Sequence, residues 1–307
     1  MFAHLAVLHG SVRSVLGGTA EGDVLLAEEA DGSVAILRGP EGVYLAGNAV
    51  SPAAAAAARA QLNGWDYIIA SPGLAGYLDA ILPHAYMLQH QRVRLAISPA
   101  ASSAPTLPDG YTYASSDEPL ATEIVHQGEV VARCGPDLTI GSYTEIGIHT
   151  HPDHRRRGLA LAATRATLQA AAAAGFSEVG WHCLASNRGS LAVARAAGLV
   201  ETHRYDAYAE ILPAENAGDL PPAVCRAHAE RLLPGVGDHI WLGFHIAGAW
   251  AQCGEIDLAL GAIERLVSSH WLGQAEWLEH HWSLAPLRTE PRFLAAVAAQ
   301  RAQTTER

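Results

Sequence analysis

The sequence predicts a mixed α/β fold in two consecutive halves, followed by an all-α region. From Gly22 the sequence contains short β-like segments separated by turn residues, and a similar order of elements returns after a segment rich in Pro, Ser and Ala. Strand signals then disappear from about Pro221 onward. At roughly 100 to 200 residues per domain, the 307 residues suit two domains or three small ones.

The first half is expected to have the order β-β-β-α-β-α-β. Asp-Gly and Gly-Pro-Glu-Gly turns separate its first three strands, and Ser51 with Pro52 begins an alanine-rich helix that runs to about Leu62. Strands are expected at residues 23–30, 33–39, 42–50, 65–71 and 86–98, with a second helix at 74–82.

The second half nearly repeats this order, which suggests an internal structural duplication. Its helices are expected at about 158–174 and 188–197, and a final strand pair at about 199–211. The other strands are expected at 110–116, 120–127, 129–135, 142–150 and 177–185.

The C-terminal region has helical periodicity, with Gly254 and Pro291 as helix breakers. Residues 240–267 resemble one tetratricopeptide-type hairpin, which cannot bury its own apolar face. We therefore expect it to pack on neighbouring helices, on the rest of the chain or on a second subunit. A homodimer or a protein partner held through this region is the expectation.

Composition and charge exclude several function classes. With 20 basic and 31 acidic side chains the net charge is −11, which argues against a nucleic-acid-binding protein that neutralises phosphates. The four cysteines form neither a disulfide framework nor a zinc ribbon, and no stretch reaches the roughly 18 apolar residues of a membrane span. A cytoplasmic location without a membrane partner is expected.

The chemically most informative segment is YTEIGIHTHPDHRRRGLALA, residues 143–162, which is expected to run from a strand through a polar loop into a long helix. Arg155, Arg156 and Arg157 precede Gly158 where the chain turns into the helix. Free N–H groups and the positive end of the helix meet there, and glycine allows close backbone approach, which suits a pyrophosphate.

This segment resembles the GNAT superfamily of acetyl-CoA-dependent N-acetyltransferases, whose acetyl-CoA motif is R/Q-x-x-G-x-G/A after strand four. Arg155, Gly158 and Ala160 match that motif. A second match follows in WHCLASNRGSLAVARAAGL, with Asn187 at the usual asparagine and Gly198-Leu199 at the usual Gly-Phe. The resemblance covers residues 110–212 and is strongest to a bacterial group with T-x-P-x-x-R-x-x-G-L-A and W-x-C-x-x-N-x-x-S strings.

The resemblance implies a GNAT-like mixed sheet and acetyl-CoA as co-substrate. The implied domains are an N-terminal lobe, possibly a degenerate GNAT-like repeat, a linker, the acetyl-CoA-binding catalytic lobe and a helical domain, at 1–97, 98–110, 111–215 and 216–307. The implied cofactor-binding residues are Ile148, His149, Thr150, Arg155, Arg156, Arg157, Gly158, Leu159, Ala160 and Asn187. Asn187 is equally suited to be a structural helix cap.

For catalysis the resemblance indicates Glu145 as the base that deprotonates the amine, although a purely structural strand carboxylate is the alternative. The family's helix-four tyrosine, which protonates the leaving thiolate, is replaced by Ala194. Tyr205 and Tyr208 are the candidate substitutes. His149 and its two neighbouring loop histidines have spacing that a metal could use, but we expect no metal there.

The resulting hypothesis is an N-acetyltransferase that transfers an acetyl group directly to a small amine, with the acceptor in a cleft between the two lobes. The alternative is a catalytically silent acyl-CoA-binding sensor or scaffold that docks a partner through its helical domain. A different acyl donor also remains open.

Overall fold

A computed structural model describes residues 1–29, 32–47, 50–100 and 105–305. Residue 30 of the first expected strand and residues 48 and 49 of the third lie outside the described residues, as do residues 101–104 of the expected linker.

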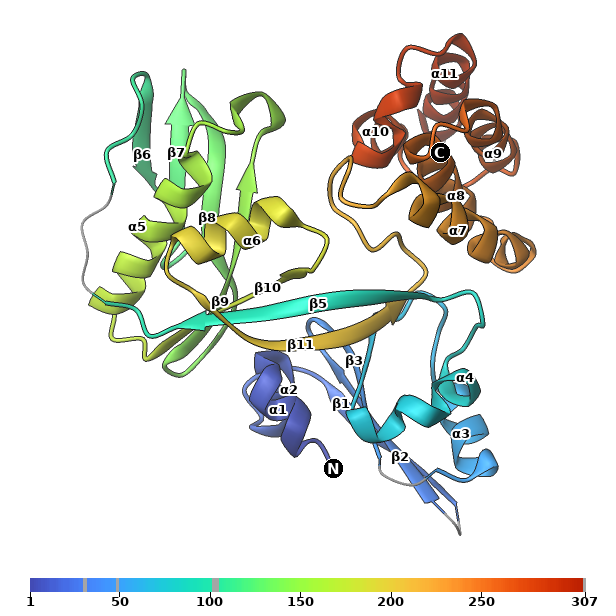
Figure 1. The fold of residues 1–307 in the computed structure, drawn as a ribbon, viewed down its shortest axis with the longest axis horizontal. Helices are drawn as coiled ribbons and strands as arrows, with labels where there is room; N and C mark the ends of the chain where they lie inside the picture. The colour runs from blue at the N-terminus through green and yellow to red at the C-terminus, as the bar shows by residue number, and fades with distance from the viewer. Residues whose placement is uncertain (30–31, 48–49, 101–104, 306–307) are drawn as a thin grey trace.

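The described chain forms one 11-stranded mixed sheet with helices on both faces (Figure 1), which confirms the predicted α/β class. The strand order is β1-β2-β3-β4-β11-β5-β10-β9-β8-β7-β6. The strands are β1 (Asp23–Glu29), β2 (Gly32–Gly39), β3 (Gly42–Ala46), β4 (Ile68–Ala70), β5 (Leu88–Ile97), β6 (Tyr111–Ser115), β7 (Thr122–His126), β8 (Glu129–Ile140), β9 (Tyr143–Thr150), β10 (Glu178–Leu184) and β11 (Val200–Ala209).

The two halves exchange their last strands. Strand β5, from the first half, pairs with β10 of the second half, and β11, from the second half, pairs with β4 of the first. The two exchanged strands also pair antiparallel with each other, from Val200–Ala96 to Ala209–Leu88. Figure 1 shows these two long strands crossing the middle of the molecule side by side.

In the described residues the two halves have similar but not identical orders of elements, with four strands before the first long helix in the second half and three in the first, and each half contains one parallel strand pair. In the first half β3 and β4 are parallel, and in the second half β9 and β10 are parallel. The expected final strand pair at 199–211 is wrong, because this segment is the single strand β11, with a register shift between Glu201 and His203. The strand that pairs with β11 is β5 from the first half, and not a second strand from the segment 199–211.

One face of the second half is covered by α5 (Leu159–Ala173) and α6 (Arg188–Ala196). Alanine at the inward positions of α5 lets this helix pack closely on the sheet, where Ala163 and Ala171 are fully buried. In the first half α3 (Pro52–Arg59), η1 (Pro72–Tyr77) and α4 (Leu78–Ile81) cover the hydrophobic core. The helix expected at 74–82 is therefore a 3-10 turn followed by one short α-helix.

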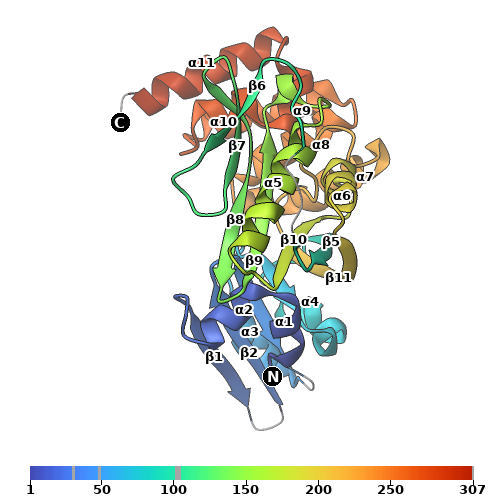
Figure 2. The same ribbon diagram turned by 90° about the vertical axis from the view of Figure 1, so that its left-hand side faces the viewer.

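The opposite face of the central strands is covered by two short helices that the sequence did not predict, α1 (Ala3–Leu8) and α2 (Gly10–Leu16). Leu5 and Val12 anchor them in a hydrophobic cluster with side chains from β2, β3, β4 and β11. Figures 1 and 2 show both helices against the middle of the sheet. They enclose the polar side chains of the central strands.

The C-terminal region is helical, as expected, and has its own hydrophobic core. Its helices are α7 (Pro222–Leu232), η3 (Leu233–Gly237), α8 (Leu242–Gln252), α9 (Ile256–Ser268), α10 (Ala275–His280), η4 (Trp282–Leu287) and α11 (Pro291–Thr305). Tyr86 and Leu88 of the first half join this core, so the α8–α9 hairpin packs within its own chain. None of the helices in the described ranges combines the length and the apolar character that a membrane span requires.

Because the exchanged strands join both halves into one sheet, we expect the halves to unfold together. The fully buried Ile36 in β2 and Ile124 in β7 allow a matched test. Ile36→Ala and Ile124→Ala should each lower the free energy of unfolding by about 2–5 kcal/mol and shift the same calorimetric transition. The exposed Leu272 provides the control Leu272→Ala, with a change below about 1 kcal/mol. Two transitions, each sensitive to one core substitution only, would contradict the expectation.

Candidate active site

The candidate site begins where β9 and β10 stop pairing. Their parallel ladder runs from Tyr143–Glu178 to Glu145–Gly180 and ends there, while β9 continues to Thr150. The other edge of β9 stays paired with β8 as far as Thr150. The edge of β9 that faces β10 is therefore open over residues 146–150, and a ligand with amide groups can hydrogen-bond to it like an added strand.

The side chains of the predicted pantetheine-binding residues differ in their surroundings along this open edge. Ile148 packs against the hydrophobic core under α5, and His149 is exposed. The hydroxyl oxygen of Thr150 is buried and has no hydrogen-bond partner among the described residues. Buried polar groups normally have a partner, so this hydroxyl fits a ligand that supplies one.

A loop of exposed arginines connects β9 to α5. The Arg155 side chain donates to the Thr150 carbonyl at 3.2 Å and to Asn216 Oδ1 at 3.0 Å, and Arg157 donates to the Asp153 carbonyl at 3.4 Å. Arg156 has a positive φ of 60°. Arg155 and Arg157 thus donate hydrogen bonds to acceptors of the protein itself. All three arginines are exposed, so the loop presents their positive charge to solvent.

Helix α5 begins without a side-chain cap. Gly158 precedes its first residue, Leu159, with a left-handed φ of 78°, and an added Cβ would have nothing within 4 Å. The first N–H groups of a helix have no partner within the helix, and Leu159 and Ala160 belong to this first turn. A cavity of about 310 Å³ adjoins this position, lined partly by Leu107, Arg157 and Gly158. Together these features favour an anion at the N-terminus of this 15-residue helix.

Asn187 acts as the N-cap of α6. Its side-chain oxygen accepts a hydrogen bond from Ser190 N–H at 2.9 Å, and its amide nitrogen donates to Glu215. The side chain is buried. Both ends of the Asn187 amide therefore have protein partners, so the structural alternative stated for this residue accounts for its position.

Glu145 lies on the face of β9 opposite α5, enclosed by the N-terminal helices. Its Oε1 accepts hydrogen bonds from Tyr143 hydroxyl at 2.7 Å and from Gly10 N–H at 3.0 Å. A Cβ at Gly10 would lie 2.9 Å from the same oxygen, so glycine is needed for α2 to begin this close to the carboxylate. Only 4% of Glu145 is exposed, and a proton must reach it through other groups.

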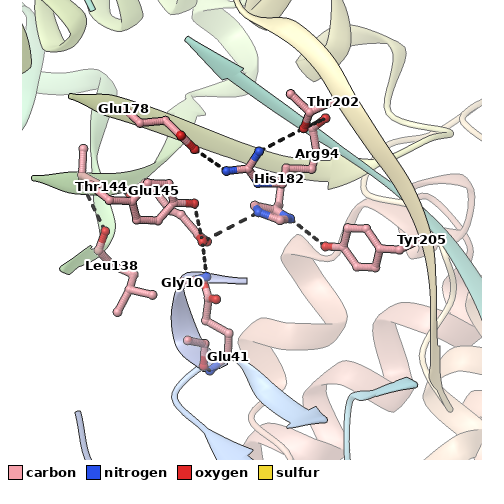
Figure 3. A network of polar contacts seen from close by, with 12 residues as sticks. Gly10, Glu41, Arg94, Leu138, Thr144, Glu145, Glu178, His182, Thr202 and Tyr205 are labelled. Atoms are coloured by element: carbon pink, nitrogen blue, oxygen red, sulfur yellow. Dashed lines mark hydrogen bonds and ion pairs between the residues drawn. The ribbon is translucent and has the colours of Figure 1, made fainter. Parts of the chain in front are cut away.

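A line of polar groups continues from Glu145 across three strands (Figure 3). His182 on β10 places Nε2 3.7 Å from Glu145 Oε1, and its Nδ1 lies 2.8 Å from the Tyr205 hydroxyl on β11. The structure thus brings the predicted Glu145 and Tyr205 into one network through His182. Tyr208 packs instead against the hydrophobic cluster of the first half.

The electrostatics keep the histidines of this network neutral. Burial and the nearby Arg92 lower the pKa of His9 to about 3, and burial lowers the pKa of His182 well below its usual value. Burial also raises the pKa of Tyr205. A neutral His182 has one ring nitrogen that accepts a hydrogen bond and one that donates, and the contact with Tyr205 can determine which nitrogen carries the proton.

Sequence reasoning missed His182, His9 and Gly10, although part of the signal was present. Residues alternate between the two faces of a strand, so His182 lies on the face opposite Trp181 and Cys183, which join the core under α5. That alternation places His182 on the same face as Glu145. No pattern in the sequence pointed to His9 or Gly10, since nothing there predicts that α1 and α2 cover this face.

A second carboxyl group near Glu145 gives the site a pH dependence. Desolvation and the Glu145 carboxylate raise the pKa of Glu41 to about 8. Between about 4.5 and 8 the folded protein then holds a proton on Glu41 that the unfolded chain releases, so the free energy of unfolding falls as pH rises through this window.

Glu41→Gln removes this titration. Its melting temperature relative to the unmodified protein should rise between pH 5 and pH 8 in scanning calorimetry at both pH values. The expected rise is only on the order of 2 °C, because Glu41 is exposed and solvent screens its interaction with Glu145. Glu129→Gln, at the exposed first residue of β8, is the matched control, and its difference in melting temperature should be the same at both pH values. An equally constant difference for Glu41→Gln would contradict the raised pKa.

Comparisons with known proteins agree with this geometry in one segment of the chain. Residues 120–208 match the family model described as GNAT acetyltransferase, whereas no curated protein matches the chain. A GCN5-related N-acetyltransferase from Kribbella flavida aligns at 20% identity and TM-score 0.45, over 66% of this chain and 94% of that chain. A GCN5-related N-acetyltransferase-like protein from Streptococcus suis aligns at 17% and 0.47, over 63% and 90%. One from Sphaerobacter thermophilus aligns at 18% and 0.44, over 59% and 76%. The segment that matches the GNAT acetyltransferase family model, residues 120–208, contains β7 to β10 and nearly all of β11.

Proposed function

We propose that the protein is an acetyl-CoA-dependent N-acetyltransferase that transfers the acetyl group directly to a small-molecule amine. The observation that carries this proposal is the open edge of β9, which leads from Glu145 directly to the uncapped N-terminus of α5. A strand-like arm that ends in a diphosphate matches both parts of this path. Coenzyme A has that construction.

In this proposal the diphosphate binds to the free N–H groups at the start of α5, next to the arginine loop. The pantetheine arm pairs with residues 146–150, where the buried Thr150 hydroxyl lacks a partner. The cavity beside Gly158 supplies space for the adenosine end. Preformed N–H donors and a helix dipole favour an anion without rearrangement of the protein.

Glu145 is the proposed proton acceptor for the attacking amine, with the neutral His182 ring beside it as a hydrogen-bond partner. The 3.7 Å between Glu145 Oε1 and His182 Nε2 is too long for a direct hydrogen bond and too short for a molecule to lie between them, so the proton is proposed to reach Glu145 through water or side chains next to the pair. Tyr205 orients His182 through its Nδ1. Tyr208 stays a prediction from the sequence, as a donor to the leaving thiolate.

The acceptor is proposed to enter on the face that carries α1 and α2. A cavity of about 390 Å³ there is lined by Ala6, Val7, Arg13, Arg94 and Glu178. Arg94 is paired with Glu178, while one terminal nitrogen of Arg13 is buried without a partner among the described residues. These groups favour a small amine that also carries an anionic group. The lining of this cavity comes from both halves of the chain, so the cavity is the proposed counterpart of the cleft between lobes expected from the sequence.

The coenzyme A position can be tested at Gly158. An alanine there is strained by the positive φ and adds a methyl group where the diphosphate is proposed to lie. Gly158→Ala should weaken coenzyme A binding at least about tenfold in calorimetry. Gly141, at the opposite end of β9, also has positive φ and open space, so Gly141→Ala reproduces the strain without the steric effect and should keep the affinity. Equal affinities would reject the position.

The role of Glu145 can be tested with an isosteric substitution. In Glu145→Gln the amide oxygen can still accept hydrogen bonds from Tyr143 and Gly10, while the proton acceptor is lost. We expect kcat to fall about 10²- to 10⁴-fold in a thiol-release assay, with unchanged coenzyme A affinity. Glu129→Gln serves as the control. Full activity of Glu145→Gln would remove Glu145 from the mechanism.

A silent acyl-CoA-binding sensor or scaffold is the second candidate. It is favoured by the buried Ala194, which replaces the family's tyrosine, and by a cavity of about 750 Å³ in the helical region, lined partly by Trp241, Trp271 and Trp277. A partner or second subunit would bind through that region. Binding of acetyl-CoA without thiol release against a panel of amines would decide for the sensor.

A further inference from the structure

Three segments far apart in the sequence meet at the junction between the sheet and the helical region. His84 lies in the loop between α4 and β5, Glu210 directly follows β11, and His239 lies between η3 and α8. Their ligand atoms all lie within 4.8 Å of one another. This cluster is separate from the Glu145 network.

The distances within the cluster suit a tetrahedral metal ion. His84 Nε2 lies 3.0 Å from His239 Nε2 and 3.9 Å from Glu210 Oε1. Ligand atoms at 2.0 to 2.1 Å from a tetrahedral zinc ion are separated by roughly 3.3 Å, which lies between these two values. Small side-chain movements are therefore enough to bring the three ligand atoms to a common centre.

The chemistry of the cluster is unsatisfied without a cation. Glu210 has a fully buried side chain, and both of its carboxylate oxygens lack a hydrogen-bond partner among the described residues. The two imidazole nitrogens face each other, so at least one must carry a proton to avoid lone-pair repulsion. A divalent cation would pair with the carboxylate and accept both nitrogen lone pairs.

The surroundings hold the ligands in place and leave space beside them. The His84 ring stacks on Tyr86 at 4.7 Å and 6°, and the His239 ring meets Trp65 edge to face. A Cβ at Gly64 would lie 2.6 Å from Glu210 Oε1 and 2.8 Å from His84 Nε2, so glycine is needed next to the cluster. His84 and His239 are only partly buried, which leaves room for water as a fourth ligand.

We propose that His84, Glu210 and His239 bind a divalent transition-metal ion, with zinc as the best fit to two imidazoles, one carboxylate and water. The ion links the first half, the end of the exchanged strand β11 and the helical region. It stabilises the position of the helical region on the sheet. This assignment is independent of the proposed acyl transfer.

The test uses the full chain, stripped with a chelator and titrated with zinc chloride in calorimetry and thermal-shift measurements. We expect one zinc ion per chain and a higher melting temperature. His84→Ala and Glu210→Gln should each weaken this binding at least about 100-fold, beyond the 10- to 100-fold effect of losing an outer-shell partner. Glu210→Gln removes a buried unpaired charge, so the metal-free variant should fold at least as well.

Fourteen other histidines could bind zinc nonspecifically, since two of the sixteen belong to the cluster, so a matched control is needed. His151→Ala and His280→Ala replace exposed histidines outside the cluster and should leave both the stoichiometry and the affinity unchanged. Absence of a one-to-one site overturns the proposal. So does zinc binding that His84→Ala and Glu210→Gln leave intact.

Discussion

The antiparallel pairing of β5 with β11 is the interaction on which the rest of the structure depends. Each of these strands leaves its own half and completes the sheet of the other, so neither half has a finished sheet alone. The exchange places Arg92 and Arg94 of β5 next to His182 of β10 and Tyr205 of β11, on one face of the sheet. The polar network around Glu145 is thus assembled from both halves.

A polar face in the middle of a sheet requires a cover, because ionisable groups buried without partners are costly. Helices α1 and α2 form this cover. Their apolar side, with Leu5 and Val12, packs on the sheet, and their junction contributes the polar groups of His9 and Gly10. The Gly10 N–H contributes a hydrogen bond to the carboxylate of Glu145. Burial and neighbouring arginines keep the histidines neutral, so the network holds positive charge only on its arginines.

Local sequence patterns predict helix starts in this protein, because a helix cap depends only on residues that are neighbours in the sequence. Ser51 with Pro52 and Asn187 were recognised as helix starts, and both side chains accept the expected backbone hydrogen bond. The segment 199–211 was misjudged as two strands, because the partner of β11 comes from a segment more than 100 residues earlier. Pairing at such separation leaves no local pattern. The cover by α1 and α2 and the His84–Glu210–His239 cluster are tertiary features of the same kind.

The two halves have similar orders of elements but differ in the features on which the proposed coenzyme A site depends. The parallel ladder of the second half ends at Glu145, whereas that of the first half ends at Leu45, an apolar residue. Helix α5 begins uncapped after three arginines, whereas the Ser51 side chain already satisfies an N–H group at the start of α3. A cap at that position competes with any anion for the same donors. The described residues of the first half therefore lack these features of the proposed coenzyme A site, and the first half contributes strand β5, hydrophobic core and the Gly10 N–H that binds Glu145.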